Sequence, residues 1–235
     1  MFLSRDILNR MPVAKKINDD FFKKWSSEMA YVLGFFAADG YITVNKRGGQ
    51  FWSIQITDLE LLRSIRAVLK SEHTIGERRV EKNEKTLYRL QIGSVGMCDD
   101  LRTLGLRERK AKGMSLPHVP SRYLQDFVRG YFEGDGNIWC GLYHKDRKTQ
   151  TPALTIVFTS CSVPFLMNLK ARLNGICHGG CLYKSKRNYA RLQYGTKDSL
   201  KLYDFMYNHS DYKKNGLFLE RKRVVLEKYK RLVRP

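Results

Sequence analysis

The chain of 235 residues contains two copies of one pattern, and this internal repeat limits its fold more than any other feature. The segment "LGFFAADGYI" aligns with "RGYFEGDGNI", which sets Asp39 opposite Asp135 at a separation of 96 residues. Farther along, "SIQITD" aligns with "TIVFTS" and "YRLQIGS" with "ARLQYGT", both at a separation of 102 residues. Because internal similarity is the signature of a repeated structural unit, we expect one fold built twice.

The boundaries of the two copies follow from the alignment. The separation grows because the first hairpin loop of the second copy, "HKDRKTQTP", is longer than its counterpart "NKRGGQ". Pro and Gly residues in "KGMSLPHVPSRY" mark the junction between the copies. We predict an N-terminal extension over residues 1–25, a first repeat over 26–116, a linker over 117–123, and a second repeat over 124–235 that ends in a basic helix.

Each copy is predicted to run helix, two strands, helix, two strands, helix. In the first copy Ser26 is a candidate N-cap, and the first helix ends near Gly40. Alternating apolar residues then predict a hairpin, and a second hairpin pairs "ERRVEK" with "TLYRLQIG". Helices are expected over about residues 59–69 and 96–104. The fold class is therefore α+β, with two pseudo-symmetric repeats, each a four-stranded antiparallel sheet that helices cover on one face.

The charge of the chain points to its partner. Lys and Arg number 43 against 23 Asp and Glu, a formal net charge of +20. A folded protein with this excess attracts polyanions, of which nucleic acid is the commonest. An anionic membrane surface is the alternative, but no amphipathic membrane helix is evident. No apolar run reaches roughly eighteen residues, so we expect no membrane-spanning segment.

The N-terminus and the cysteines suggest a compartment. The stretch "MFLSRDILNRMPVAKK" has early charges and no apolar centre, so it is not expected to be a secretory signal. The 5 cysteines lie mostly in apolar stretches, as buried thiols do. Cys177, His178 and Cys181 resemble metal ligands but lack a second pair at a matching spacing, so zinc is not expected. These features favour an intracellular, reducing compartment, either cytoplasm, nucleoid or organelle matrix, over secretion.

The strands have one apolar and one polar face. Trp52, Ile54 and Ile56 alternate on the core face of one strand, and polar residues occupy the other face. Strand pairs fit the major groove of DNA and present alternate side chains to base edges. A merely solvated sheet face is the alternative interpretation. The predicted DNA-binding residues are Tyr41, Thr43, Asn45, Arg47, Ser53, Gln55, Thr57, Arg78, Arg89, Gln91, Asn137, Trp139, Thr155, Thr159, Lys184, Lys186, Arg191 and Gln193.

Two apolar helices each finish on Asp-Gly. Small residues would let these helices approach closely, and they are Gly34, Ala37 and Ala38 in the first helix and Gly130 and Gly134 in the second. Their ends would bring Asp39 and Asp135 together. Carboxylates at the negative end of a helix dipole are unfavourable, and a divalent cation such as Mg²⁺ would offset them. An ordinary Asp-Gly turn after a helix is the alternative.

The segments "VLGFFAADG" (32–40) and "VRGYFEGDG" (128–136) resemble the two motifs of a single-chain LAGLIDADG homing endonuclease. The resemblance extends over nearly the whole chain. It implies an αββαββα unit used twice, with the two motif helices at the central interface and saddle-like sheets that straddle double-stranded DNA. It also implies Mg²⁺-dependent cleavage of both DNA strands, with Mn²⁺ as a substitute.

The resemblance also implies roles for individual residues. Asp39 and Asp135 would bind metal, with main-chain carbonyl groups from Ala38 and Gly134. Glu133 and Ala37 occupy a motif position that is not catalytic. Two polar residues beside the metal site would be Asp58, which is also suited to cap the next helix, and Ser160. Basic residues near the scissile phosphates would be Lys110 and Lys213, with Arg109 and Lys214 as alternatives and a solvated lysine as the simpler interpretation.

The expected function is site-specific cleavage of DNA by a monomer that needs no protein partner. An intron RNA maturase, or an inactive DNA-binding protein of the same fold, is the alternative. The family resemblance makes the chain a candidate intron-encoded protein. An intein is not expected, because the C-terminal "KRLVRP" lacks a His-Asn ending.

Overall fold

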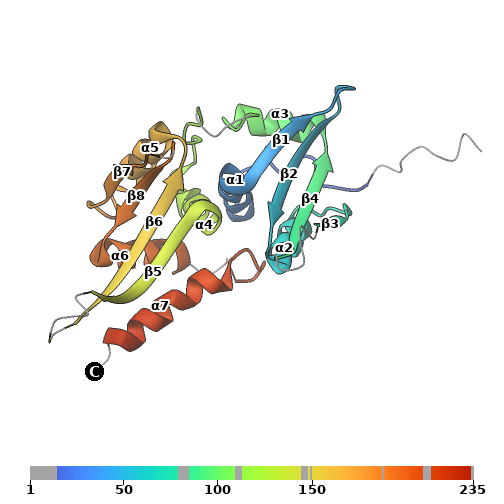
Figure 1. Cartoon of the computed structure of the whole chain (residues 1–235). Coiled ribbons are helices and arrows are strands. Elements are labelled where there is room, and N and C mark those ends of the chain that lie inside the picture. The colour runs from blue at the N-terminus through green and yellow to red at the C-terminus, as the bar shows by residue number, and fades with distance from the viewer. Residues whose placement is uncertain are drawn as a thin grey trace, which may run out of the picture.

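The computed structural model describes residues 15–78, 85–108, 113–143, 148, 150–186, 188–208 and 213–233. The protein has two halves, each with one four-stranded antiparallel sheet. Helices α1 (Ser27–Asp39) and α4 (Leu124–Asp135) lie side by side between the halves (Figure 1). The prediction of an α+β fold made of two repeats is confirmed.

The first half follows the predicted order of elements. After α1 come β1 (Gly40–Val44), β2 (Gln50–Ile56), α2 (Leu59–Val68), β3 (Ile75–Arg78), β4 (Leu87–Gly93) and α3 (Val95–Thr103). The strands lie in the order β1-β2-β4-β3. Ser26 caps α1 as predicted, because its Oγ accepts a hydrogen bond from the Met29 amide at 3.1 Å.

The second half repeats this order after a short 3₁₀ turn at Ser121–Tyr123. Its elements after α4 are β5 (Gly136–Tyr143), β6 (Thr151–Ser160), α5 (Val163–Leu173), β7 (Cys181–Lys184), β8 (Ala190–Tyr194) and α6 (Thr196–Tyr207). The strand order is β5-β6-β8-β7, equivalent to that of the first sheet. The basic C-terminal helix α7 (Glu220–Val233) packs on β5 and β6.

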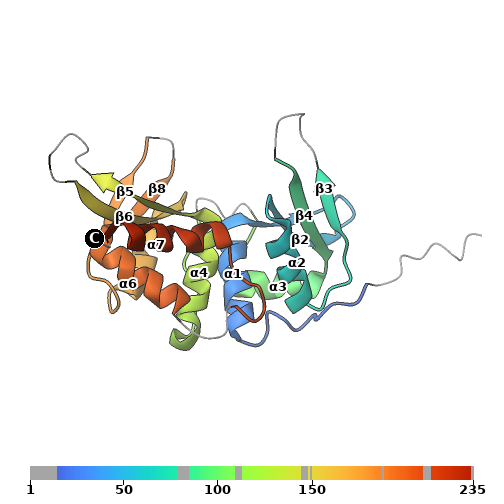
Figure 2. The ribbon, with the colours of Figure 1, turned by 90° about the horizontal axis from the view of Figure 1, so that it is seen from below.

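Each sheet has a covered face and an outer face. Figure 2 shows the helices gathered below the two sheets. On the covered face of the first sheet, Trp52 pairs with Ile92 and Ile54 with Leu90, and all four side chains are buried. The second sheet buries Leu154, Ile156 and Phe158 in the same way. The outer faces are therefore the surfaces left available to a partner.

Small residues set the distance between α1 and α4. A methyl group at Gly34 would collide with the main-chain oxygen of Phe127, and one at Gly130 would collide with that of Tyr31. The two helices thus touch backbone to backbone, as the sequence predicted. No helix in the described part of the chain is long and apolar enough to cross a membrane.

Candidate functional site

Each of the two central helices runs directly into a strand without an intervening turn. Gly40 and Gly136 have extended backbones, with φ of −81° and −86°. Neither glycine is required by its φ, because L residues adopt these angles readily. A side chain at Gly40 would instead collide with the ring of Phe36, and one at Gly136 with Phe132. Glycine thus leaves room for an aromatic side chain at the point where each helix ends on its aspartate.

The ends of the two helices meet. A methyl group at Gly134 would collide with the side chain of Ala38 and would lie 3.0 Å from Oδ2 of Asp39. The Asp39 carboxylate therefore lies against the residue that precedes Asp135. Asp39 is half-buried and Asp135 is exposed. Both carboxylates act on Tyr131, since burial and their negative charges raise the pKa of its buried hydroxyl.

The Asp39 side of this junction opens into a small cleft of about 190 Å³. Asp58 lines the cleft together with Asp39, Glu133 and Arg221. However, Oδ1 of Asp58 accepts a hydrogen bond from the Leu61 amide at 3.0 Å, so this carboxylate caps α2. The structure thus gives Asp58 both a position at the site and a local structural role.

On the Asp135 side, the counterpart Ser160 is buried rather than exposed to a ligand. Its Oγ accepts a hydrogen bond at 3.0 Å from the amide of Ser162, the residue whose side chain caps α5. Tyr131 lies nearby and donates a hydrogen bond from its hydroxyl to the Thr159 carbonyl at 2.7 Å. The two halves of the site are therefore not equivalent.

The predicted basic residues are described only in part. Lys110 and its alternative Arg109 lie outside the described residues. Lys213 and Lys214 lie in the segment before α7, and both side chains are exposed. The positive charge of Lys213 contributes to lowering the pKa of Glu220, although the hydrogen bond from Arg223 contributes more.

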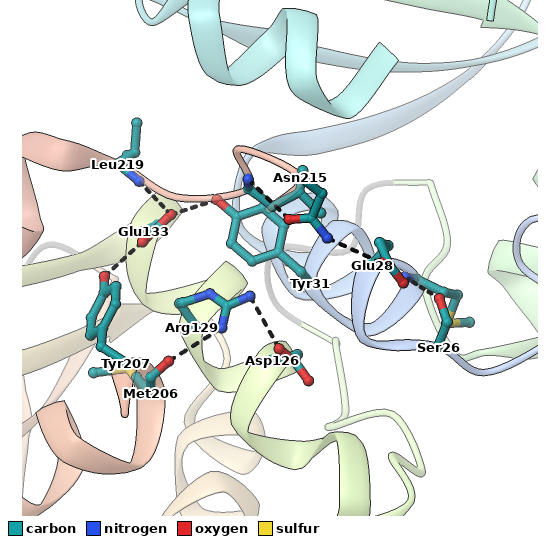
Figure 3. Close-up of polar contacts among 12 residues, drawn as sticks. Ser26, Glu28, Tyr31, Asp126, Arg129, Glu133, Met206, Tyr207, Asn215 and Leu219 are labelled. Atoms are coloured by element: carbon teal, nitrogen blue, oxygen red, sulfur yellow. Dashed lines mark hydrogen bonds and ion pairs between the residues drawn. The ribbon is translucent and has the colours of Figure 1, made fainter. Parts of the chain in front are cut away.

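Glu133 proves to be a structural centre of the interface (Figure 3). This fully buried carboxylate accepts hydrogen bonds from the hydroxyl of Tyr31, from the hydroxyl of Tyr207 at 2.6 Å and from the amide of Leu219 at 2.9 Å. Burial raises its pKa, while the two tyrosine hydrogen bonds act in the opposite direction. One side chain of α4 thus ties together α1, α6 and the segment that leads into α7.

A buried ion pair lies next to this carboxylate (Figure 3). Arg129 contacts Asp126 at 3.1 Å, one turn earlier on α4, and donates a hydrogen bond to the Met206 carbonyl at 3.2 Å. Its guanidinium also lies over the ring of Tyr31, 5.1 Å from the centroid. The interface between the halves therefore contains a polar network as well as close backbone packing.

A second residue that sequence reasoning missed is Lys222 of α7. Its ammonium group contacts the carbonyl oxygens at the end of α4, among them that of Gly134. Burial and the charge of Arg221 lower the pKa of Lys222 to about 7, and the charges of Glu133, Asp39 and Asp135 act in the opposite direction. The sequence carried a signal: Lys222 lies on the apolar stripe of α7, in line with Leu226 and Tyr229.

The donor groups at the two helix ends suit a hard cation. Asp39 and Asp135 offer carboxylates, and Ala38 and Gly134 lie in last turns, where carbonyl groups lack intrahelical donors. Oxygen donors of this kind are those that Mg²⁺ prefers. Within the described residues, no group of three or more His, Cys, Asp or Glu side chains is arranged so that it could hold a metal ion by itself. Any cation here would depend on the two aspartates, carbonyl groups and water.

On the outer face of the first sheet, the predicted residues form rows across the strands. Tyr41, Ser53 and Gln91 lie in one row, and Gln55 lies opposite Arg89 in the next. Arg78 shares this face, because it pairs with Leu87. Thr43, Thr57, Arg78 and Arg89 are exposed, and Tyr41, Gln55 and Gln91 are half-buried. Ser53 is 0% exposed, so its side chain does not reach the surface.

Two predicted residues lie in the β1–β2 turn. Oδ1 of Asn45 accepts hydrogen bonds from the amides of Arg47 at 2.9 Å and Gly49 at 2.8 Å. Asn45 thus shapes the turn itself, as asparagine often does. Arg47 is exposed at the tip of this hairpin.

The outer face of the second sheet is more aromatic. Exposed Asn137 and half-buried Gln193 flank Val157 in one row, and half-buried Thr159 lies opposite exposed Arg191. Trp139 is exposed and stacks on Tyr143, with ring centroids 5.3 Å apart. The remaining outer positions include exposed Tyr183 and Cys181.

Three predicted residues of this sheet differ from expectation. Thr155 is only 8% exposed, because it lies on the inner strand β6 opposite Trp139. Lys184 pairs with buried Ala190, so its side chain leaves the face opposite to that of Arg191. Lys186 is exposed in the turn after β7 rather than on a strand. The expectation of a shared outer face is therefore wrong for Lys184.

Comparison with known proteins shows what the chain resembles. Residues 26–98 match the family model of the LAGLIDADG-like domain. No curated protein matches the chain. Among solved structures, I-SmaMI bound to an uncleaved DNA target in the presence of calcium ions has 13% identity and a TM-score of 0.57, over 89% of this chain and 90% of that chain.

Two further solved structures agree. The I-LtrWI LAGLIDADG homing endonuclease bound to target DNA has 12% identity and a TM-score of 0.60, over 92% of this chain and 90% of that one. The LAGLIDADG meganuclease I-AabMI bound to uncleaved DNA has 18% identity and a TM-score of 0.56, over 86% and 88%. The resemblance found in the sequence is thus confirmed: residues 26–98 match the LAGLIDADG-like domain, and the chain as a whole has the fold of single-chain LAGLIDADG homing endonucleases.

Proposed function

We propose that this protein is a site-specific homing endonuclease that cuts both strands of a long double-stranded DNA target by metal-dependent hydrolysis. The observation that carries the proposal is the meeting of the ends of α1 and α4, each of which finishes on an aspartate, between two sheets of a protein with a net charge of +20. Solved proteins with the same fold and bound DNA targets support it.

Binding would use the outer faces of the two sheets. Arg89 and Gln91 in the first half, and Arg191 and Gln193 in the second, are side chains that can form paired hydrogen bonds with guanine or adenine edges. The excess of basic residues would supply the contacts to phosphates that dominate affinity. Two sheets in one chain can contact two half-sites, so a second copy of the chain is not needed.

Cleavage would use the junction of α1 and α4. Asp39 and Asp135, with the carbonyl groups of Ala38 and Gly134, would hold divalent cations, with Mg²⁺ preferred and Mn²⁺ as a substitute. When bound there, such a cation lowers the pKa of its water and neutralises charge at the phosphodiester. Asp39 and Asp135 would fix the position of the cations relative to the DNA. Lys213 would contribute positive charge near the scissile phosphate.

A cleavage selection on a randomised DNA library with Mg²⁺ tests the activity and yields the target sequence. With that target, Asp39→Asn and Asp135→Asn are each expected to abolish double-strand cleavage, while the dissociation constant for DNA stays close to that of the unmodified protein. Asp204→Asn, at an exposed carboxylate on α6, is the matched control and should cut normally.

Three other results would contradict the proposed mechanism or the proposed function. Full cleavage by either Asn variant would remove that carboxylate from the mechanism. Specific binding of the selected DNA without cutting in Mg²⁺ or Mn²⁺ would indicate a DNA-binding protein that lacks nuclease activity. Protection of intron RNA, with no protected DNA, would indicate a maturase.

A further inference from the structure

The ammonium group of Lys222 is buried at the end of helix α4. The side chain is only 5% exposed. Its Nζ donates to the carbonyl oxygens of Glu133 at 2.8 Å and Gly136 at 2.6 Å, also contacts that of Phe132, and lies 3.5 Å from that of Gly134. It also lies 4.9 Å from the centroid of the Phe132 ring.

Three of these acceptors, the carbonyl groups of Phe132, Glu133 and Gly134, belong to the negative end of the α4 dipole. Carbonyl groups of a last helical turn need donors from outside the helix. Neither α1 nor α4 has a basic residue in its own last turn, and each ends on an aspartate. For α4, the ammonium group of Lys222, from helix α7, donates to these carbonyl groups and offsets the negative end of the helix dipole.

The first half has no equivalent lysine. When "KGMSL" is aligned with "NGLFL", Lys222 corresponds to Val119, a buried apolar residue that carries no charge. The hydrogen bond made by Leu219 differs between the halves as well. In the second half the Leu219 amide donates to the carboxylate of Glu133, whereas the equivalent position in the first half is Ala37, whose side chain cannot accept a hydrogen bond. The segment from Leu219 to Lys222 therefore holds α4 by contacts for which its counterpart, residues 116–119, has no equivalent lysine.

We propose that Lys222 is a positioning residue for one half of the catalytic centre: its hydrogen bonds hold the backbone that carries Asp135, whereas its charge alone acts on Asp39. The inference rests on the proposed function. The two strands of a duplex are antiparallel and the two halves are related by a pseudo-two-fold axis, so each aspartate serves mainly one strand. Loss of Lys222 should therefore impair cleavage of one strand selectively.

The test compares Lys222→Met with Lys222→Arg on the selected target. Met retains most of the packing without the ammonium, whereas Arg keeps a cationic donor. Each DNA strand is labelled at one end, so that the cleavage rate of each strand is measured separately. We expect Lys222→Met to slow one strand by about 10- to 100-fold relative to the other, as a small misplacement of a reacting group does. Nicked DNA should accumulate, and Lys222→Arg should restore cleavage in part.

Matched controls identify the affected half. Lys230→Met removes an exposed lysine of the same helix, paired with Glu227, and should cut both strands normally. In Asp135→Asn the slow strand should be the strand that is slow in Lys222→Met, and in Asp39→Asn it should be the other one. Equal slowing of both strands would reduce Lys222 to a general stabilising role and overturn the proposal, as would unchanged cleavage.

A measurement without metal or DNA gives an independent readout. In Lys222→Met, the amides of residues 135–138 should exchange hydrogen faster than in the unmodified protein, with no change over residues 39–42. Faster exchange in both segments, or in neither, would overturn selective positioning of α4. If the unmodified protein cut no DNA at all, the proposed function would fail, yet hydrogen exchange would still decide whether Lys222 holds this helix.

Discussion

Gly130 lies against the main-chain carbonyl oxygen of Tyr31, so close that a single methyl group would overlap that oxygen. The opposing atom is backbone, so no side chain can rotate to make room. The same relationship, with the helices exchanged, holds between Gly34 and Phe127. The distance between the two halves, and hence between the two aspartates, is set by these contacts.

Gly130→Ala is expected to separate α1 from α4 and to lower the free energy of unfolding by about 1–3 kcal/mol or more. Urea unfolding followed by circular dichroism measures the change. Gly96→Ala is the matched control, since a methyl group there meets nothing within 4 Å and Gly96 lies in helix α3. That control should raise stability by up to about 1 kcal/mol. A neutral effect of Gly130→Ala would contradict the close approach of the helices.

Glu133 accepts three hydrogen bonds with two carboxylate oxygens, and its Oε2 serves both Tyr31 and Leu219. Glu133→Gln replaces one acceptor oxygen with an amide group that cannot accept. At least one buried donor then loses its acceptor, which costs about 1–3 kcal/mol of unfolding free energy. Chemical denaturation measures this loss.

Glu227→Gln, at an exposed glutamate of α7, serves as the control and should change stability by less than about 0.5 kcal/mol. Equal effects of the two substitutions would show that the Glu133 network contributes little to the interface between α1, α4 and α6.

Much of this architecture could be predicted because it depends on local patterns. Alternation along residues 51–57 fixed the two faces of β2, and the repeat made Asp135 the counterpart of Asp39. Burial of Ser53 could not be predicted in this way, because Ser53 lies between two larger residues, Tyr41 and Gln91, on the two neighbouring strands. Such cross-strand coverage depends on register, which one strand does not encode alone.

Lys222 illustrates a second limit. Its place on the apolar stripe of α7 indicates burial, but its acceptors lie at the end of α4 and the start of β5, between 86 and 90 residues earlier in the chain. A single sequence cannot identify contacts across such a separation unless the repeat supplies a matching partner, and the first repeat has Val119 at that position. Contacts that differ between the two repeats, such as those of Lys222, therefore could not be predicted from the sequence and are revealed by the structure.

Burial separates the cysteines into two groups. Cys98 and Cys177 are buried, which raises the pKa of each thiol to about 11, whereas Cys161 and Cys181 are exposed. We expect iodoacetamide to modify Cys161 and Cys181 in the native protein, with Cys98 and Cys177 protected until unfolding. Peptide mass spectrometry after timed alkylation measures each rate.

The same pKa shifts predict the stability at alkaline pH. Because the folded-state pKa lies above the ordinary value near 9, the folded protein binds these two protons more tightly than the unfolded chain. The stability they contribute is retained below pH 9 and is lost as the pH rises toward 11. The urea concentration at the midpoint of unfolding should fall as the pH rises through this window. It should fall less steeply in Cys98→Ser, when each variant is compared with its own midpoint at neutral pH.

Cys181 reports on the DNA interface, because it lies opposite Gln193 on the outer face of the second sheet. Bound target DNA should slow its alkylation markedly, with no change at buried Cys98. Equal alkylation rates at Cys181 with and without DNA would remove β7 from the interface and restrict contacts to the other strands of this sheet.

Trp139 and Thr43 occupy equivalent positions in the two repeats, yet one is a large aromatic residue and the other a small polar one. Trp139 is 42% exposed and stacks on Tyr143, which is 47% exposed. This pair forms an apolar surface on the outer face of β5, whereas the first sheet presents the small polar side chain of Thr43 at the position of Trp139. Apolar side chains in the major groove recognise the methyl group of thymine. We therefore predict that the second repeat reads thymines in its half-site.

Deoxyuridine tests this recognition, because it differs from thymidine only by the absence of that methyl group. Replacing contacted thymidines in the half-site of the second repeat should weaken binding by about fourfold per methyl, from roughly 0.8 kcal/mol for one buried methyl group. In Trp139→Ala the same replacement should have no further effect, because the methyl has lost its contact. Thr43→Ala should leave the deoxyuridine effect in this half-site intact. A full deoxyuridine effect in Trp139→Ala would assign thymine recognition to other residues of the sheet.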